Sequence, residues 1–528
     1  MFRFKIFLIH FILFTTYLSA QQVNTLYFME NAPMRHMLNP AFQPVFLPSP
    51  KELFPPRTQF YFSLPIIGYT NFSLGSNDLT IKDLAYKNAG QSISFLHPNG
   101  DVNRFYSSLA PLTSLNVDIE TNLLGIGYKS MSHFWTFNIT EKRGINAGVP
   151  RDIFNLLLNG TKSYMSNNYY FTNLQLNYYN YTEAAFGYSY QIDEHTKVGL
   201  KLKYLNGTAQ LSTNNQQTTL HTGVDQLKIE GGGTINAAVP NQLGIDPSYS
   251  SFLTTAPSNL LSLLQFPPSL QSLLQSNGRG AGLDMGIEKN VNEQITLSAS
   301  LTDLAYLHWK RNTMNLNYSV DYTFNGIINA TPDTRLNTIP GNINNLMGAN
   351  VLLDSLTNAL TTASSFGESH NDFFTSTPIK MNLGGEYKFF NKRLSTAVLY
   401  KLYIASILFS ERSFSKILPQ NELTFSVNGR PHEWLNTSVS YSFLNGKWST
   451  FGAALGLRTG PIHWMLAADY IPLFTTHLPS NSAQVVNTNF PLHYIPIPYT
   501  SNQFNFALGI NYIFQPKPNE RTCNCNWR

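Results

Sequence analysis

Charged residues, cysteine and long apolar segments are all scarce in this sequence. Only 12% of the 528 residues are charged, about half the share found in a typical soluble domain. The two cysteines, Cys523 and Cys525, lie at the end of the chain, so its body contains no disulfide framework. Beyond the N-terminal segment, no run reaches the roughly 18 uncharged apolar residues of a membrane helix. If the protein is integral to a membrane, it must therefore cross it as a closed β-barrel, because only helices and closed barrels satisfy the backbone in lipid.

Motifs for nucleic-acid binding, metal binding and catalysis are also missing. The net charge is only +5 and there is no basic run, which argues against a nucleic-acid partner. We find no zinc-protease motif, phosphate loop, dinucleotide fingerprint or serine-hydrolase elbow. The remaining hydrolase candidate is Ser440 or Ser442 with His463, for which polar filling of a lumen is the favoured alternative. We therefore predict no enzyme activity, no cofactor and no metal site.

The N-terminus has the three parts of a secretory signal peptide. Arg3 and Lys5 precede an apolar stretch from Ile6 to Phe14, and Leu18-Ser19-Ala20 provides a small-residue cleavage site. A retained anchor helix is the alternative, but the apolar run is short for one. We predict that residues 1–20 are removed by cleavage after Ala20 and that the protein is exported to a bacterial outer membrane.

Strict alternation of apolar and polar residues dominates the mature chain. Aromatic residues make up 13% of the full 528-residue sequence, yet its mean hydropathy is -0.15. In Met314 to Phe324 every second residue is apolar and the interleaved residues are polar, which gives a strand one apolar and one polar face. Its length of about eleven residues suits a tilted membrane-crossing strand. A soluble all-β protein is the alternative to a membrane barrel.

Similar segments predict an all-β, transmembrane antiparallel barrel of about fourteen strands, with twelve to sixteen compatible with the sequence. The closing strand has the clearest pattern. Its apolar face, expected to meet lipid and to be recognised by barrel-assembly machinery, consists of Phe504, Phe506, Leu508, Ile510, Tyr512 and Phe514.

The sequence divides into three regions after the signal peptide. Residues 21–57 carry seven prolines and little alternation, which favours an N-terminal plug or periplasmic cap over a disordered leader. We assign 58–514 to the barrel, with insertions at 234–279 and 326–378 that carry short helical patterns, and 515–528 to a periplasmic tail. A parity count puts the second insertion outside and the first inside. Either one intervening strand does not cross, or the first insertion is periplasmic or lumenal.

Charges on the polar phases of the strands are expected to face the lumen, where they cost less than against lipid. Pairing across strands is favoured over a conduction path because both signs occur. The lumen charges predicted in this way are Lys201, Lys203, Lys228, Glu230, Asp284, Glu288, Lys380, Glu386 and Lys388. The thiols of Cys523 and Cys525 cannot complete a zinc site alone. They mark either a docking tail or a functionally silent one.

Three stretches resemble one family. They are the mature start from Asn24 to Pro44, the segment Gly282–Gly286 with Ile295–Leu304 and Trp309, and the closing strand. Together they are similar to a family of uncharacterised Bacteroidota outer-membrane barrels known only as a domain of unknown function. More distantly, Asn39-Pro40-Ala41, followed by Phe42, resembles the start of FadL-type fatty-acid porins and of the PorV and PorP/SprF barrels of type IX secretion. That resemblance implies a plugged barrel of about fourteen strands.

Two functions are compatible with these features. The first is a FadL-like channel or binder for a small hydrophobic molecule. The second is a non-enzymatic accessory barrel for protein secretion, surface display or barrel assembly, with a periplasmic or secretion partner protein. No ligand-binding residue can be carried over from either resemblance.

Overall fold

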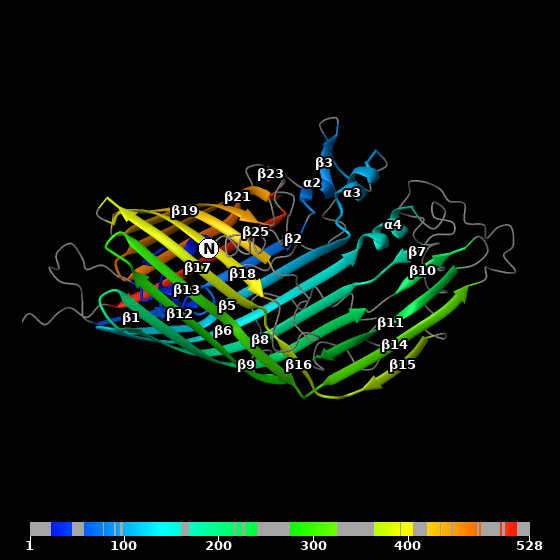
Figure 1. Ribbon diagram of the computed structural model, residues 1–528, viewed down its shortest axis with the longest axis horizontal. Coiled ribbons are helices and arrows are strands. Elements are labelled where there is room, and N and C mark those ends of the chain that lie inside the picture. The colour runs from blue at the N-terminus through cyan, green and yellow to red at the C-terminus, as the bar shows by residue number, and fades with distance from the viewer. Residues whose placement is uncertain are drawn as a thin grey trace, which may run out of the picture.

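In the computed structural model, the chain closes on itself as an antiparallel ring of strands (Figure 1). The structure describes residues 23–44, 58–239, 275–324 and 364–514. Within these ranges 78, 89–90, 96–98, 160–167, 216–217, 224–226, 391, 405–419, 433, 445–446, 472–474, 477–496 and 499–501 are not described. No helix in the described part of the chain is long and apolar enough to span a membrane.

The described ring has fourteen strands, and the sequence-based prediction of about fourteen is confirmed. The first position is shared by two short strands, which both pair with β25 and β5 and so close the barrel. In ring order the strands are β1 (Thr58–Ser63) with β2 (Thr70–Ser76), β5 (Leu112–Ser130), β6 (His133–Pro150), β8 (Gln175–Gln191), β9 (Thr196–Asn215), β12 (Gly278–Asn290), β13 (Ile295–Trp309), β17 (Ile379–Phe389), β18 (Leu394–Ile404), β19 (Gln420–His432), β20 (Leu435–Leu444), β21 (Lys447–Thr459), β22 (Ile462–Ile471) and β25 (Gln503–Phe514).

The ring places apolar side chains outside and polar ones inside. On β25, Asn505 and Asn511 are fully buried, whereas Tyr512 and Phe514 are 40% and 53% exposed. On β13, Ser300 is buried and Leu297 is 49% exposed. Because successive side chains on a strand point to opposite faces, this pattern gives the barrel an apolar outer surface and a polar lumen.

The two ends of the ring differ in their connections. At one end, which we call the short-turn end, six strand pairs are joined by two to four residues each. The other end, the long-connection end, carries α2 (Ile81–Leu84), β3 (Ala85–Asn88), β4 (Gln91–Ser94), α3 (Val102–Ser108), α4 (Arg151–Asn159), β23 (Thr475–Thr476) and β24 (Ile497–Pro498). The N-terminal end of β1 and the C-terminal end of β25 both lie at the short-turn end.

A second branch of the sheet continues the wall beyond the ring at the long-connection end (Figure 1). It leaves the ring where the far half of β9 pairs with β11 instead of β12. Its strands are β7 (Asn168–Tyr170), β10 (Thr219–Thr222), β11 (Leu227–Ala238), β14 (Thr313–Phe324), β15 (Ser364–Ser369) and β16 (Phe373–Ser376). We refer to this branch as the extension.

The extension corrects three of the sequence-based expectations. The strand Met314–Phe324 is β14, which pairs with β11 and β15 and is not part of the ring. Residues 234–238 and 278–279 of the first predicted insertion are strand, and the second insertion contains β15 and β16. With β14 outside the ring, the described chain that flanks both insertions lies at the long-connection end. The helical patterns predicted within the insertions lie outside the described residues.

Candidate functional site

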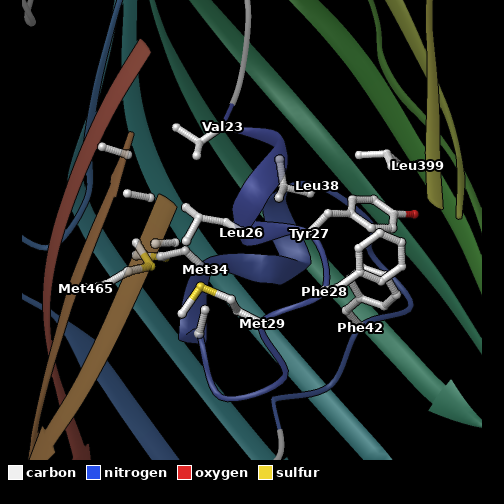
Figure 2. Packing of buried hydrophobic residues seen from close by; sticks show 14 of the residues in the cluster. Val23, Leu26, Tyr27, Phe28, Met29, Met34, Leu38, Phe42, Leu399 and Met465 are labelled. Carbon is white, nitrogen blue, oxygen red and sulfur yellow. The ribbon is translucent and has the colours of Figure 1, made fainter. Parts of the chain in front are cut away.

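The lumen is filled by an N-terminal segment, residues 23–44, which we call the plug. It contains two short 3-10 helices, η1 (Asn24–Leu26) and η2 (Pro33–Met37). Plug side chains, including Leu26, Phe28 and Met34, form a buried apolar cluster with small or apolar residues of the inner wall (Figure 2). Leu399 and Met465 belong to this wall. The predicted bounds of 21–57 for this region stay a prediction, because residues 21–22 and 45–57 are not described.

The Asn39-Pro40-Ala41-Phe42 motif lies against the inner face of β12 and β13. The Asn39 side-chain amide donates to the carbonyls of Ile287 and Ala299, at 3.3 and 3.2 Å, and its oxygen accepts from the Ala41 amide at 3.0 Å. The Phe42 ring packs on Tyr27 with a centroid distance of 5.0 Å. Asn39 therefore acts as a polar clamp between the plug and the wall.

Two glycines of the wall create the space for this motif. A Cβ atom on Gly199 would lie 2.2 Å from the carbonyl carbon and oxygen of Pro40, and one on Gly286 would lie 1.9 Å from Asn39 Oδ1. Side chains at either position would occupy the volume of the plug. The close approach of plug and wall thus requires glycine at these two positions.

Replacing Asn39 with alanine is expected to lower the free energy of unfolding by about 1–3 kcal/mol, since two carbonyls lose a buried donor. Denaturant unfolding of the detergent-solubilised protein measures the change. Asn31→Ala in the same segment is the matched control, because Asn31 Oδ1 is buried without a hydrogen-bond partner among the described residues. Equal effects of the two substitutions would show that Asn39 is not a clamp.

The start of the plug is fixed to the opposite part of the wall. Asp469 on β22 accepts from the backbone amides of Asn24 and Thr25 and from the Thr25 hydroxyl. The Thr25 hydroxyl also lies 2.7 Å from Ser440 Oγ, and Lys401 donates to the Asn24 side chain. Asp469 thus anchors the first plug turn through three donors.

Glu30 ties the plug to the short-turn end of the barrel. Its carboxylate contacts the Lys388 ammonium and lies 3.4 Å from the guanidinium of Arg430. Burial alone would raise the pKa of Glu30, but the positive charges of Lys388, Arg35 and Arg430 outweigh it and lower the pKa to about 2. The plug is therefore held by a carboxylate that stays ionised well into the acid range.

Acidification should weaken this attachment in a defined pH window. Since the folded-state pKa of Glu30 lies below the ordinary value of 4.5, its contribution is complete above pH 4.5 and lost as the pH falls towards 2. We expect the difference in unfolding free energy between wild type and Glu30→Gln to shrink across this window. Denaturant unfolding of both proteins at several pH values tests it. A difference that stays constant would contradict the ion pairs.

A continuous set of charged side chains lies on the inner face of the wall, between the plug and the long-connection end. Six neighbouring strands, β6, β8, β9, β12, β13 and β17, each contribute one side chain. This set, which we call the charged belt, comprises Lys142, Glu183, Lys203, Asp284, Asp303 and Lys380. It contains three cations and three anions, so its formal charge is zero.

Asp303 is the centre of the charged belt. Its carboxylate lies 3.1 Å from the Lys142 ammonium and 2.8 Å from those of Lys203 and Lys380. A bulge in β13 places Thr302 and Asp303 opposite Asp284, and both residues are buried. Asp303 has a left-handed backbone with φ of 63°, and its amide donates to Asp284 at 2.7 Å. The bulge turns a side chain inward that regular alternation would place outside.

Most of the predicted lumen charges face inward in the ring, but Lys228 and Glu230 lie on β11 of the extension, where they pair with each other. Lys203 and Lys380 belong to the charged belt, and Lys388 contacts both Glu30 and Glu386. Lys201 lies 3.3 Å from the carbonyl oxygen of His36 in the plug. These contacts join the charges to groups of the wall and of the plug. Cys523 and Cys525 lie outside the described residues.

Several residues of the site are absent from the sequence-based set. Lys142 stands between two charged residues, Glu141 and Arg143, so the alternation of polar and apolar residues does not show which face it occupies. Glu183 follows a stretch of tyrosines, and Asp303 is displaced by the bulge. Polar alternation gave a usable signal for three members of the charged belt, Lys203, Asp284 and Lys380.

The residues considered for hydrolysis do not come together. Ser440 on β20 and His463 on β22 lie on either side of β21. Ser440 is opposite Gly452 of β21, and His463 is opposite Arg458 of the same strand. Six positions along a strand correspond to roughly 20 Å, so Ser440 and His463 are not a catalytic pair. Ser442, opposite Thr450, is farther away. No group of three or more potential metal ligands occurs within the described ranges.

Comparison with solved structures gives distant similarities to membrane channels. The Pseudomonas putida toluene transporter TodX aligns over 92% of this chain and 92% of its own, with 10% identity and a TM-score of 0.37. A Pseudomonas aeruginosa FadL homologue aligns over 94% of this chain and 99% of its own, with 9% identity and a TM-score of 0.33. These values are too low to transfer a ligand or a role.

Comparison with protein families gives a specific result. No curated protein matches the chain. The model of the family of unknown function DUF5723 matches residues 54–469, which is most of the chain and nearly all of the ring. The chain belongs to the DUF5723 family.

Proposed function

We propose that this protein is an outer-membrane barrel that binds a small, mostly apolar molecule in its plugged lumen and passes it inward. The apolar outer face suits lipid, and short turns are typical of the periplasmic end of such barrels. That orientation places the plug attachment at Glu30 and the tail 515–528 in the periplasm, after export and cleavage at Ala20. The apolar belt of the closing strand, ending at Phe514, would be recognised by barrel-assembly machinery.

One observation carries the proposal: the centre of an otherwise polar lumen is apolar. The plug brings Leu26, Phe28, Met34 and Phe42 into contact with Leu399 and Met465. Around this cluster, wall residues such as Asn505 and Asn511 are polar and buried. A pore for polar solutes would need a water-filled path. The plug and the charged belt occupy that path, and the apolar cluster provides favourable contacts for an apolar molecule.

Purified protein and a variant lacking residues 23–44 test the proposal. We expect saturable binding of the apolar fluorophore N-phenylnaphthylamine by wild type, and no sucrose entry in liposome swelling. The deletion variant should admit sucrose. Sucrose entry through wild type, or no saturable binding together with no co-purified apolar molecule in native mass spectrometry, would refute it.

The alternative is an accessory barrel for secretion, display or assembly. The extension favours it, because β11, β14 and β15 continue the wall well past the ring and offer a surface for a partner protein. Co-purification in mild detergent distinguishes the two functions. A stoichiometric partner that is lost when the extension is altered would support the accessory function, and a monomer would support the channel.

A further inference from the structure

The outer wall carries an apolar groove on the side of the barrel where β17 to β20 lie. Its volume is about 740 Å³, and its lining extends from β13 to β21. Exposed apolar side chains border it, among them Leu297, Tyr387, Phe425, Val427 and Val439. A Cβ atom on Gly385 would have its nearest neighbour, the Leu297 side chain, at 3.7 Å. The absence of a side chain at Gly385 therefore leaves space at the bottom of the groove.

The groove backs onto the wall that holds the plug. Ala397 and Ser440 line the groove, Ala397 also belongs to the plug's apolar cluster, and the Ser440 hydroxyl contacts Thr25. On the inner side, a Cβ atom on Gly384 would lie 2.9 Å from the Tyr27 ring. The same thin wall therefore has the plug on one side and the groove on the other.

Cationic and aromatic residues lie directly below the groove, at the short-turn end. In the turn between β17 and β18, Phe390 is 75% exposed and is followed by exposed Lys392 and Arg393. In the turn between β19 and β20, Trp434 is 53% exposed and stacks on His432 at 5.5 Å. Aromatic and basic residues together are typical of the level of lipid headgroups.

The charge at this rim is locally positive. Lys392 and Arg393 line one depression together with Lys388 and Arg430, where the carboxylates are those of Glu30 and Glu386. Neither Lys392 nor Arg393 has a salt-bridge partner in the described chain. Other turns at the same end differ in sign: the β8–β9 turn carries Asp193 and Glu194, and the β12–β13 turn carries Glu293. The β17–β18 turn, which borders the groove, thus differs from these two turns in the sign of its charge.

We propose that this wall binds one anionic phospholipid of the periplasmic leaflet, with its acyl chains in the groove and its phosphate at Lys392 and Arg393. A groove that faces the membrane interior selects an apolar chain, and the cations at its end select a negative headgroup. The proposal rests on the membrane placement given under the proposed function and is independent of what the lumen binds.

Native mass spectrometry of the full-length, delipidated protein tests the site. The protein is incubated with equal amounts of phosphatidylglycerol and phosphatidylethanolamine that carry identical chains. We expect wild type to retain one phosphatidylglycerol with a preference of about tenfold, since each basic residue near an anionic headgroup adds attraction. The variant Lys392→Glu/Arg393→Glu should retain both lipids equally. Lys310→Glu/Arg311→Glu, the same charge change in exposed residues at the other end, should keep the preference.

The acyl groove is tested separately by filling it. Gly385→Trp should reduce retention of both lipids, whereas Leu200→Trp, on the outer face of β9, should not. If the charge-reversed variant does not fold, Lys392→Gln/Arg393→Gln replaces it. Equal retention of the two lipids by wild type, an unchanged preference in the turn variants, or unchanged retention in Gly385→Trp would overturn the proposal. Displacement by inorganic phosphate alone would also overturn it, by assigning the site to a free anion. Lumen binding of N-phenylnaphthylamine is measured separately from lipid retention, so the failure of one proposal can be told from the failure of the other.

Discussion

Replacing Asp303 with asparagine is expected to lower the free energy of unfolding by about 3–5 kcal/mol, because the change leaves buried lysines without their shared anion. Asp303 lies within 3.1 Å of Lys142, Lys203 and Lys380, and no side chain of this group is more than 15% exposed. In the variant, only Glu183 and Asp284 remain to balance three cations. Denaturant unfolding in detergent, followed by tryptophan fluorescence, measures the loss.

The control is an ion pair of similar chemistry in an exposed position. Asp321 on β14 lies 3.4 Å from Lys228 and its side chain is 74% exposed. Asp321→Asn should therefore cost less than about 1 kcal/mol, as exposed pairs usually do. Adding Lys380→Met to Asp303→Asn should recover part of the loss, because it removes one uncompensated cation. A cost for Asp303→Asn no larger than that of Asp321→Asn would show that the charged belt does not stabilise the barrel.

The charged belt also shows where sequence periodicity stops being informative. Alternation placed Lys203 and Lys380 on the inner face because their strands are regular there. The side chains of Thr302 and Asp303 are both buried, although successive residues of a regular strand point to opposite faces. They share the inner face because β13 bulges at this point. A bulge shifts the phase of every later residue on its strand, and its position depends on a partner strand that is distant in sequence.

The ring itself could be predicted because each strand carries its own pattern. The pattern does not say what the apolar face touches. Met314 on β14 is 1% exposed and packs in a buried apolar cluster with Leu211 and Ala237, whereas Leu297 on β13 is 49% exposed on the outer face of the ring. Both strands alternate equally well. Alternation therefore identified β14 correctly as a strand and wrongly as a strand of the ring.

The plug contacts could not be predicted in the same way. Thr25 and Asp469 are separated by 444 positions in the sequence, and the Asn39 amide binds two carbonyl groups that any residue would supply. Such contacts leave no periodic signal. Composition alone distinguished residues 21–57 from the strands. The Asn39-Pro40-Ala41 motif, through its resemblance to the start of plugged barrels, indicated that this segment is a plug.

Replacing Gly199 with alanine is expected to open the lumen, because the new methyl group takes the place of the Pro40 backbone. The added Cβ would lie 2.2 Å from the Pro40 carbonyl group and 2.4 Å from the Ala41 nitrogen. Neither atom can move by side-chain rotation, and β9 is held by β8 and β12 on its two sides. The plug must therefore leave the wall. Planar-bilayer recordings should show conductance for this variant and none for wild type.

Two further glycines make the test specific. At Gly286 the obstacle is the Asn39 side-chain oxygen, which can rotate away, so Gly286→Ala should conduct less than Gly199→Ala. At Gly385 the nearest atom is 3.7 Å away on the outer face, so Gly385→Ala should stay closed. Glycine usually weakens a strand, so alanine in its place should not by itself destabilise the barrel. If all three variants conduct equally or none does, the glycines do not hold the plug. The expected ranking, in contrast, follows only if lumen closure depends on direct contact between the plug backbone and β9.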